Sequence, residues 1–210
     1  MNSVSSTVRL IGAGLRALLV MTVICGVLYP LAVTGIAQAA FNDKANGSEI
    51  KDGSGRVVGS SLIGQSYGDD LRWFQGRPAA GLGANSINTR YELLLSGATN
   101  KAADNPDLLK SVNEAKAKVL ADNTVPGYTP QEAQIPAEAV TSSGSGLDPH
   151  ISPRYAGIQV HRVAERNHLD VEQVEKLVKD HTDGRTLGFM GEPRVNVLEL
   201  NTALEALAAK

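Results

Sequence analysis

Hydrophobic and polar positions follow two different patterns in this chain of 210 residues: one long apolar run near the N-terminus, and alternating apolar and polar positions after it. The first is a run of 26 residues, from Ala17 to Asn42, without an acidic, basic or histidine side chain. As a helix this run would extend about 39 Å, whereas the hydrocarbon core of a bilayer needs only about 20 residues. We therefore predict three parts: a short N-terminus over residues 1–16, a membrane anchor over 17–42, and one polar domain over 43–210.

The charges that flank the anchor indicate its direction. Arg9 and Arg16 precede it with no acidic residue among them, and Asp43, Lys44 and Glu49 follow it. Basic residues collect on the cytoplasmic side of spanning helices. The pattern predicts a single-pass protein of the cell inner membrane, with a cytoplasmic N-terminus and a periplasmic main domain.

A cleaved signal peptide is the alternative interpretation of the same segment. Ala37-Gln38-Ala39 fits the small-residue pattern of a cleavage site. The apolar region is about twice the usual 7–15 residues of such peptides, which favours a retained anchor. The alternative predicts a secreted protein whose mature N-terminus is Ala40.

After the anchor, the spacing of apolar residues predicts an α+β domain with more helix than strand. Two short runs read as strands: Arg56–Gly64, which is partly β-branched and bounded by glycine, and Leu71–Gln75, which Gly76-Arg77-Pro78 ends. Four segments show helical spacing behind a capping residue. They are 106–121 behind Asn105, 153–167 behind Ser152, a helix opened by a capping box of Asp170 and Gln173, and a C-terminal helix opened by Asn196 and Glu199.

Composition narrows the possible functions of this domain. All 22 acidic residues but only 18 of the 20 Lys and Arg lie in 43–210, so its net charge is −4. A net negative charge is not typical of a nucleic-acid-binding domain, which needs a basic surface. Cys25 is the only cysteine and lies in the anchor, so the domain has no disulfide. The four histidines fit no metal-binding motif, so we predict no metal ligand.

Candidate chemistry is densest between Val140 and Pro153, which read VTSSGSGLDPHISP. One interpretation is an envelope serine hydrolase with Ser145 as nucleophile, His150 as base and Asp148 as its orienting acid. A triad normally converges from separate parts of a fold, and here all three residues lie within six positions. We therefore expect no catalytic residue. Loops of this kind commonly carry recognition, which makes Ser143, Ser145, Asp148 and His150 candidates for a partner interface.

Six segments of the sequence resemble, in order, the C subunit of the Kdp potassium-transporting ATPase of bacteria. The resemblance runs from the anchor to the C-terminal helix and departs at Ser96–Pro106, where Ala98 and Lys101–Asp104 differ from the usual pattern. The matching segments are Tyr29–Gly35, Asn46–Ser48, Val58–Gln65, Phe74–Pro78, Ser142–Pro153 and Leu187–Leu200.

The resemblance implies an accessory subunit in a four-protein membrane complex. Its partners would be a channel-like potassium-binding A subunit, a P-type B subunit that hydrolyses ATP, and a small F subunit. The family is also described as a catalytic chaperone that raises the ATP affinity of the B subunit. No tightly bound cofactor is implied, although ATP would be bound together with the B subunit, and Gln159 matches a glutamine proposed to touch nucleotide.

The predicted topology conflicts with a direct nucleotide contact. Cytosolic ATP cannot reach Gln159 if residues 43–210 lie outside, so an effect on ATP affinity would have to cross the membrane as a coupling between two states. The alternative for Gln159 is an ordinary polar position on a helix. Within the anchor, the small residues Gly26, Ala32 and Gly35 are candidates for close helix contact with a partner in lipid.

Overall fold

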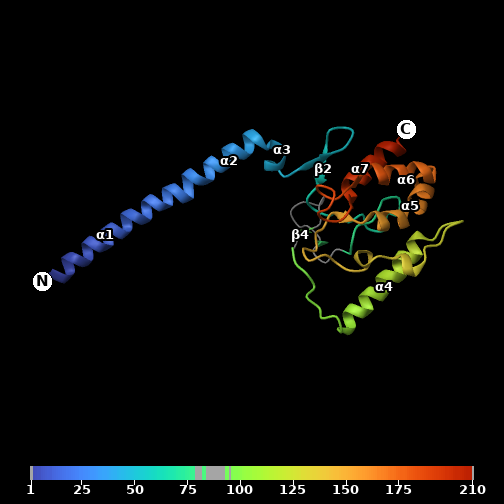
Figure 1. Ribbon diagram of the computed structural model, residues 1–210, viewed down its shortest axis with the longest axis horizontal. Helices are drawn as coiled ribbons and strands as arrows, with labels where there is room; N and C mark the ends of the chain where they lie inside the picture. The colour runs from blue at the N-terminus through green and yellow to red at the C-terminus, as the bar shows by residue number, and fades with distance from the viewer. Residues whose placement is uncertain (1, 79–81, 84–92, 95, 210) are drawn as a thin grey trace. The chain divides into compact units, whose positions relative to one another are not determined.

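The computed structural model describes residues 2–78, 82–83, 93–94 and 96–209. The chain divides into two compact units, Met1–Ser48 and Glu49–Lys210 (Figure 1).

The first unit is a long helix that contains a π-helical turn before a proline. It comprises α1 (Asn2–Val23), the π turn η1 (Ile24–Leu28) and α2 (Tyr29–Ala40), and the short α3 (Asn42–Ala45) follows it. Pro30 lacks an amide hydrogen, and its ring crowds the carbonyl group four residues earlier. A wider turn over the preceding residues accommodates both effects, so the helix continues past Pro30 without ending there.

One helix in the described part of the chain is long and apolar enough to cross a membrane. It covers Val4–Ala40, and none of its most apolar window is buried. The helix begins earlier than the predicted anchor because the residues before Ala17, which include Arg9 and Arg16, are helical as well.

The second unit mixes helices and short strands, as the spacing of apolar residues predicted. The strands among its described residues form three small antiparallel sheets, of which the largest has the order β5-β7-β6. In chain order the elements are β1 (Glu49–Lys51), β2 (Val57–Ser60), β3 (Leu82–Gly83), β4 (Leu93–Leu94), α4 (Pro106–Asn123), η2 (Glu132–Gln134), η3 (Ala137–Ala139), β5 (His150–Ile151), α5 (Pro153–Asn167), α6 (Val171–Asp180), β6 (Thr182–Asp183), β7 (Arg194–Asn196) and α7 (Val197–Ala208).

Side-chain caps fix where the four helices of this unit begin. Asn105, Ser152 and Asn196 each accept backbone amide hydrogens of the first helical turn through a side-chain oxygen. Asp170 and Gln173 form the predicted reciprocal capping box of α6. These caps satisfy amides that no carbonyl of the helix can reach, which confirms the predicted starts.

Helix α5 lies at the centre of the core and packs against α4, α6 and β7. Ala156 and Val163 of α5 are fully buried, as are Leu200 and Leu204 of α7. Val195 of β7 completes this contact. The small sheet is therefore held by helices rather than by strand pairing alone.

The predicted strand over Leu71–Gln75 is wrong. These residues form turns and irregular backbone, although Phe74 within them is fully buried. Their backbone groups pair with side chains of α5 and α7 instead of with another strand. Apolar composition predicted the burial correctly but could not reveal where the hydrogen bonds go.

Asp52 closes the turn between β1 and β2. Its carboxylate accepts the Ser54 hydroxyl at 2.6 Å and the backbone amides of Ser54 and Arg56 at 2.9 and 3.0 Å. The Ser54 hydroxyl and these amides lower the pKa of Asp52 to about 2, because they stabilise the charged form.

Candidate functional site

Segments distant in the sequence converge on the loop over residues 142–149. Gly64 donates its amide to the carbonyl oxygen of Leu147 at 2.8 Å. A Cβ at Gly64 would lie 2.8 Å from the backbone oxygen of Asp148, closer than real Cβ contacts come. Glycine is therefore required here for the two segments to touch.

Arg77 joins a third segment to the same loop. Its guanidinium donates to the Asp148 carboxylate at 3.1 Å and to the Ser142 carbonyl at 3.3 Å. The other carboxylate oxygen of Asp148 accepts the His150 amide at 2.9 Å and lies 3.3 Å from Nδ1 of His150. Asp148 thus holds Arg77 on one side and the start of β5 on the other.

The start of α7 brings a fourth segment to this loop. The amide of Val197 donates to Pro149 at 3.0 Å, and the side-chain amide of Asn196 donates to the Ser61 carbonyl at 2.8 Å. Asn196 also pairs with His150 across β5 and β7. Four of the six segments that resemble the Kdp C subunit therefore meet at one place.

The divergent loop over residues 96–106 reaches the same surface. Gly97 donates its amide to the Ser145 carbonyl at 2.8 Å. An open depression beside this contact is lined by Leu62, Ile63, Arg77, Ser143, Gly144, Ser145, Leu147, Asp148 and Pro149. We call this depression and its rim the loop surface. The predicted interface residues Ser143, Ser145 and Asp148 line it, whereas His150 does not line it but hydrogen-bonds to Asp148.

The geometry of the loop surface does not favour a serine hydrolase. The Ser145 hydroxyl lies 3.2 Å from the Ser143 hydroxyl and accepts the Leu147 amide at 3.1 Å. Among the described residues, no hydrogen bond joins Ser145 to His150, whose ring faces Asp148 instead. A nucleophile needs its base within hydrogen-bond reach, and these bonds direct the two side chains to different partners.

Gln159 lies inside the domain, with none of its side chain exposed. Its side-chain oxygen accepts the Gln75 amide at 2.7 Å, and its side-chain nitrogen donates to the Gln75 carbonyl at 3.0 Å. The oxygen also accepts from Arg162 at 2.7 Å. Gln159 therefore completes the backbone pairing of a segment that pairs with no strand among the described residues. Contact with nucleotide remains a prediction that would require these bonds to open.

Asn201 of α7 binds the backbone of Phe74, the residue before Gln75, in the same way. Its side chain accepts the Phe74 amide and donates to the Phe74 carbonyl, both at 2.9 Å. Two amide side chains from different helices thus bind both backbone groups of Phe74 and Gln75. We call Gln159 and Asn201 the amide clamp.

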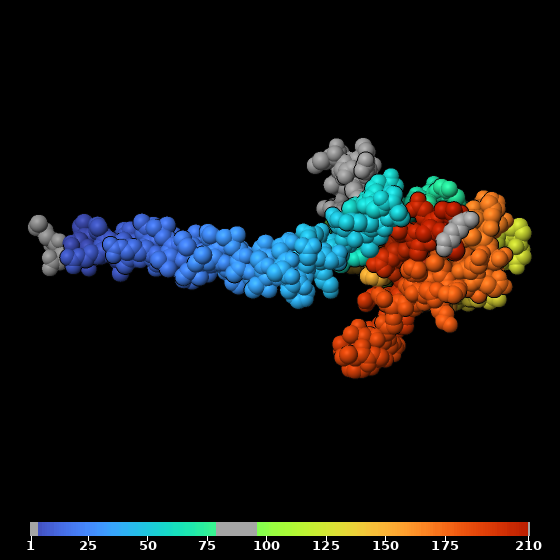
Figure 2. Space-filling model, turned by 90° about the horizontal axis from the view of Figure 1, so that it is seen from above, coloured from blue at the N-terminus to red at the C-terminus, as the bar shows by residue number. Residues whose placement is uncertain are grey.

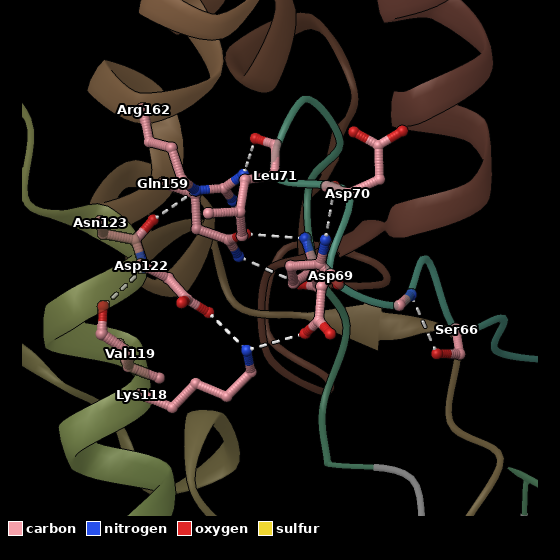
Figure 3. A network of polar contacts seen from close by, with 12 residues as sticks. Ser66, Asp69, Asp70, Leu71, Lys118, Val119, Asp122, Asn123, Gln159 and Arg162 are labelled. Atoms are coloured by element: carbon pink, nitrogen blue, oxygen red, sulfur yellow. Dashed lines mark hydrogen bonds and ion pairs between the residues drawn. The ribbon is translucent and has the colours of Figure 1, made fainter.

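Arg162 extends this network into the turn before the clamp (Figure 3). It is 1 % exposed and donates to Asn123 at 2.9 Å, to the Trp73 carbonyl at 3.0 Å and to the Leu71 carbonyl. Burial lowers the pKa of Arg162 to about 10, which still leaves the group charged at neutral pH. Its donors satisfy carbonyl groups that would otherwise be buried without partners.

The same view shows α4 approaching the segment from the other side. Lys118 lies between Asp122 of its own helix, at 3.1 Å, and Asp69, at 3.2 Å (Figure 3). Both contacts raise the pKa of Lys118, the Asp122 hydrogen bond most strongly. Because the Lys118 side chain is largely exposed, these pairs orient the segment more than they stabilise it.

Gln159 lies on a helix, as predicted, but its pairing with the backbone of Gln75 was not predicted. The available signal was two polar residues, Gln159 and Arg162, at the apolar positions of an amphipathic helix. A buried polar side chain requires a partner, so their spacing indicated a buried network, although not which backbone it holds.

The candidate contact residues of the anchor lie in the helix of the first unit. Gly26 falls in η1, and Ala32 and Gly35 lie three positions apart in α2, so the latter two share one side of that helix. A Cβ at Gly35 would meet nothing within 4 Å. A partner helix at this side of α2 remains a prediction. Among the described residues, no group of three or more His, Cys, Asp or Glu could hold a metal ion.

Comparison with known proteins decides the family. The family described as "K+-transporting ATPase, c chain" matches residues 11–206. The chain belongs to this family. A potassium-transporting ATPase KdpC subunit of Streptomyces avermitilis is 64% identical over 219 residues, covering 99% of this chain and 98% of the relative. The KdpC subunit of Streptomyces coelicolor is 63% identical, with 99% and 96% covered.

More distant relatives carry the same name. The KdpC subunit of Geotalea uraniireducens is 45% identical over 190 residues, which cover 90% of this chain and 94% of the relative. The resemblance inferred from six short segments is therefore confirmed over nearly the whole chain. Membership of the KdpC family makes the chain a subunit of a potassium-transporting ATPase and disfavours the free-standing hydrolase.

Proposed function

We propose that the chain is a non-catalytic subunit that assembles the Kdp complex and raises the ATP affinity of its B subunit from the far side of the membrane. The observation that supports this most directly is the convergence of four family-like segments on the loop surface. That surface joins half-buried charged groups and serines without placing a nucleophile beside a base, which suits recognition better than catalysis.

The proposed topology places the helix Val4–Ala40 in the inner membrane and residues 43–210 in the periplasm. Arg9 and Arg16 before the apolar run support this direction. Labelling of single cysteines by an impermeant maleimide in intact spheroplasts tests it, with Cys25→Ser as the background. A cysteine replacing exposed Glu165 should be labelled from outside, and one replacing Ser3 only after lysis.

In this proposal the helix packs beside the channel-like A subunit in lipid, and the loop surface contacts a partner outside. The P-type B subunit and the small F subunit complete the complex. Loss of the chain should therefore abolish growth at micromolar potassium while growth at millimolar potassium continues. Normal growth of the deletion strain at micromolar potassium would contradict the proposal.

The effect on ATP affinity is proposed to act by coupling rather than by contact. If the outer domain binds more tightly to the conformational state that also binds ATP more tightly, it shifts the pump toward that state and raises the apparent affinity for ATP. The buried position of Gln159 supports this route, because all its described hydrogen bonds are made within the domain.

An azido-ATP photolabel distinguishes coupling from contact. In the assembled complex, coupling predicts a lower Michaelis constant for ATP when the chain is present, with label on the B subunit alone. Label on the peptide that contains Gln159 would establish the direct contact instead.

A further inference from the structure

The connection between β6 and β7 is a projecting hairpin with an apolar tip. All residues from 183 to 194 are exposed, and the orange-red segment stands out from the rest of its unit (Figure 2). Leu187, Phe189 and Met190 are 79%, 70% and 48% exposed. Beyond Ser48, only three other large apolar side chains among the described residues are classed as exposed, and they lie apart in sequence, at Val57, Leu62 and Leu109.

The hairpin has a fixed shape although it touches no core. Thr186 and Met190 pair across the turn with bonds of 2.8 and 2.9 Å. Arg185 and Glu192 form an ion pair at 2.9 Å below the tip. The base continues into β7, where Val195 is fully buried. The tip is therefore held in place before any partner arrives, which lowers the entropy cost of binding.

The backbone of the tip is also strained. Leu187 has a φ of +55°, a left-handed conformation that residues with a branched apolar side chain rarely adopt. Such strain persists where the surroundings impose it and collects at binding sites. Leu187 holds this conformation at the most exposed apolar position of the tip.

We propose that this tip docks into an apolar recess on the outward-facing surface of a membrane-embedded subunit of the same complex. The inference rests on the proposed function, because it requires assembly with other subunits. The outer domain and the apolar helix belong to one chain, and eight residues separate the end of α2 from the start of β1. A partner held in the same membrane thus meets the tip at high effective concentration.

Two other occupants fit the hairpin less well. Its charged residues are two arginines, one aspartate and one glutamate, so it lacks the basic excess that attracts a segment to anionic lipid. Three side chains are also far short of the roughly 1,200 Å² that a specific dimer of two copies would bury. A defined backbone and a neutral, compact apolar tip match a shaped protein recess.

The first test replaces the apolar tip within the full-length chain. The double variant Leu187→Ser with Phe189→Ser should lower recovery of the channel-like subunit with the tagged chain at least about tenfold, because two large contacts are lost. Leu109→Ser, on exposed α4, is the matched control and should leave recovery unchanged. Unaltered Trp73 fluorescence would show that the double variant is folded, and unchanged recovery would overturn the inference.

The second test identifies the occupant by cross-linking. Phe189→p-benzoylphenylalanine in the assembled complex should yield an adduct with one membrane-embedded subunit on irradiation. An adduct with lipid alone, with a second copy of this chain, or with nothing would each overturn the proposal. If the tip variant recovers the partner subunits as well as the wild-type chain does, the docking inference fails but the proposed function stands.

Discussion

Replacing Gln159 by leucine should destabilise the outer domain by removing one half of the amide clamp. The two side chains have similar volume, so packing changes little. The substitution leaves three groups without their partner: the Gln75 amide, the Gln75 carbonyl and one nitrogen of Arg162. At about 1 kcal/mol for each unsatisfied group, the free energy of unfolding should fall by about 3 kcal/mol.

The only tryptophan of the chain reports this change directly, because Trp73 lies in the clamped segment. With a urea dependence of about 2 kcal/mol per molar, a loss of about 3 kcal/mol should lower the unfolding midpoint by about 1.5 M. The measurement is Trp73 fluorescence of the full-length chain in detergent during urea titration. Glu165→Leu, at an exposed position of the same helix, is the matched control and should shift the midpoint little.

Unfolding of Gln159→Leu and Glu165→Leu at the same urea concentration as the wild type would show that the clamp does not stabilise the domain. A large shift for Gln159→Leu with unchanged nucleotide labelling of the complex would support a structural role for Gln159. Loss of labelling without any shift in stability would favour a nucleotide contact.

The remaining predictions concern the loop surface and the first turn of the domain. Gly64→Ala should lower stability by about 1–3 kcal/mol through contact with the Asp148 backbone, seen as a lower urea midpoint, whereas Gly53→Ala in open space should not. Arg77→Met should reduce recovery of the channel-like subunit several-fold, and stability should fall by about 1–3 kcal/mol because the partly buried Asp148 carboxylate loses its partner; equal recovery would contradict the interface. Because hydrogen bonds lower the folded-state pKa of Asp52 from 3.8 to about 2, it contributes stability that is present above pH 3.8 and lost as the pH falls toward 2. Asp52→Asn should show a smaller decrease of the urea midpoint over that range, and an identical pH profile would argue against the assignment.

The helices were predictable from the sequence because their signals are local. Asn105, Ser152 and Asn196 each stand directly before the helix that they cap, and two of them precede a proline at the first helical position. The capping box of Asp170 and Gln173 is likewise read from neighbouring residues. A hydrogen bond within one turn depends on sequence spacing alone, so these starts did not require knowledge of the fold.

The clamped segment was not predictable because its partners are distant. Phe74 bonds to a side chain 127 positions later, and Gln75 bonds to one 84 positions later. A run of apolar and aromatic residues indicates burial but not whether a strand or a side chain satisfies the backbone. The interpretation as a strand therefore failed where long-range contacts decide the conformation.

The candidate site was predictable in part. The dense polar loop around Asp148 was recognisable as a candidate interface, but its contact with Arg77 spans 71 positions of the chain and has no local signal. The requirement for glycine at position 64 was not predictable either, because it depends on the distance to a backbone oxygen that is remote in sequence. The apolar run Phe189-Met190 between glycines was visible in the sequence, whereas its projection from the domain was not.

Co-purification tests the central claim most directly. The chain would be tagged at its C-terminus, extracted in mild detergent from membranes of potassium-starved cells, and its partners identified by mass spectrometry. The account predicts recovery of a P-type ATPase subunit together with a channel-like membrane protein. Recovery of the full-length chain alone, under conditions that preserve other membrane complexes, would contradict it.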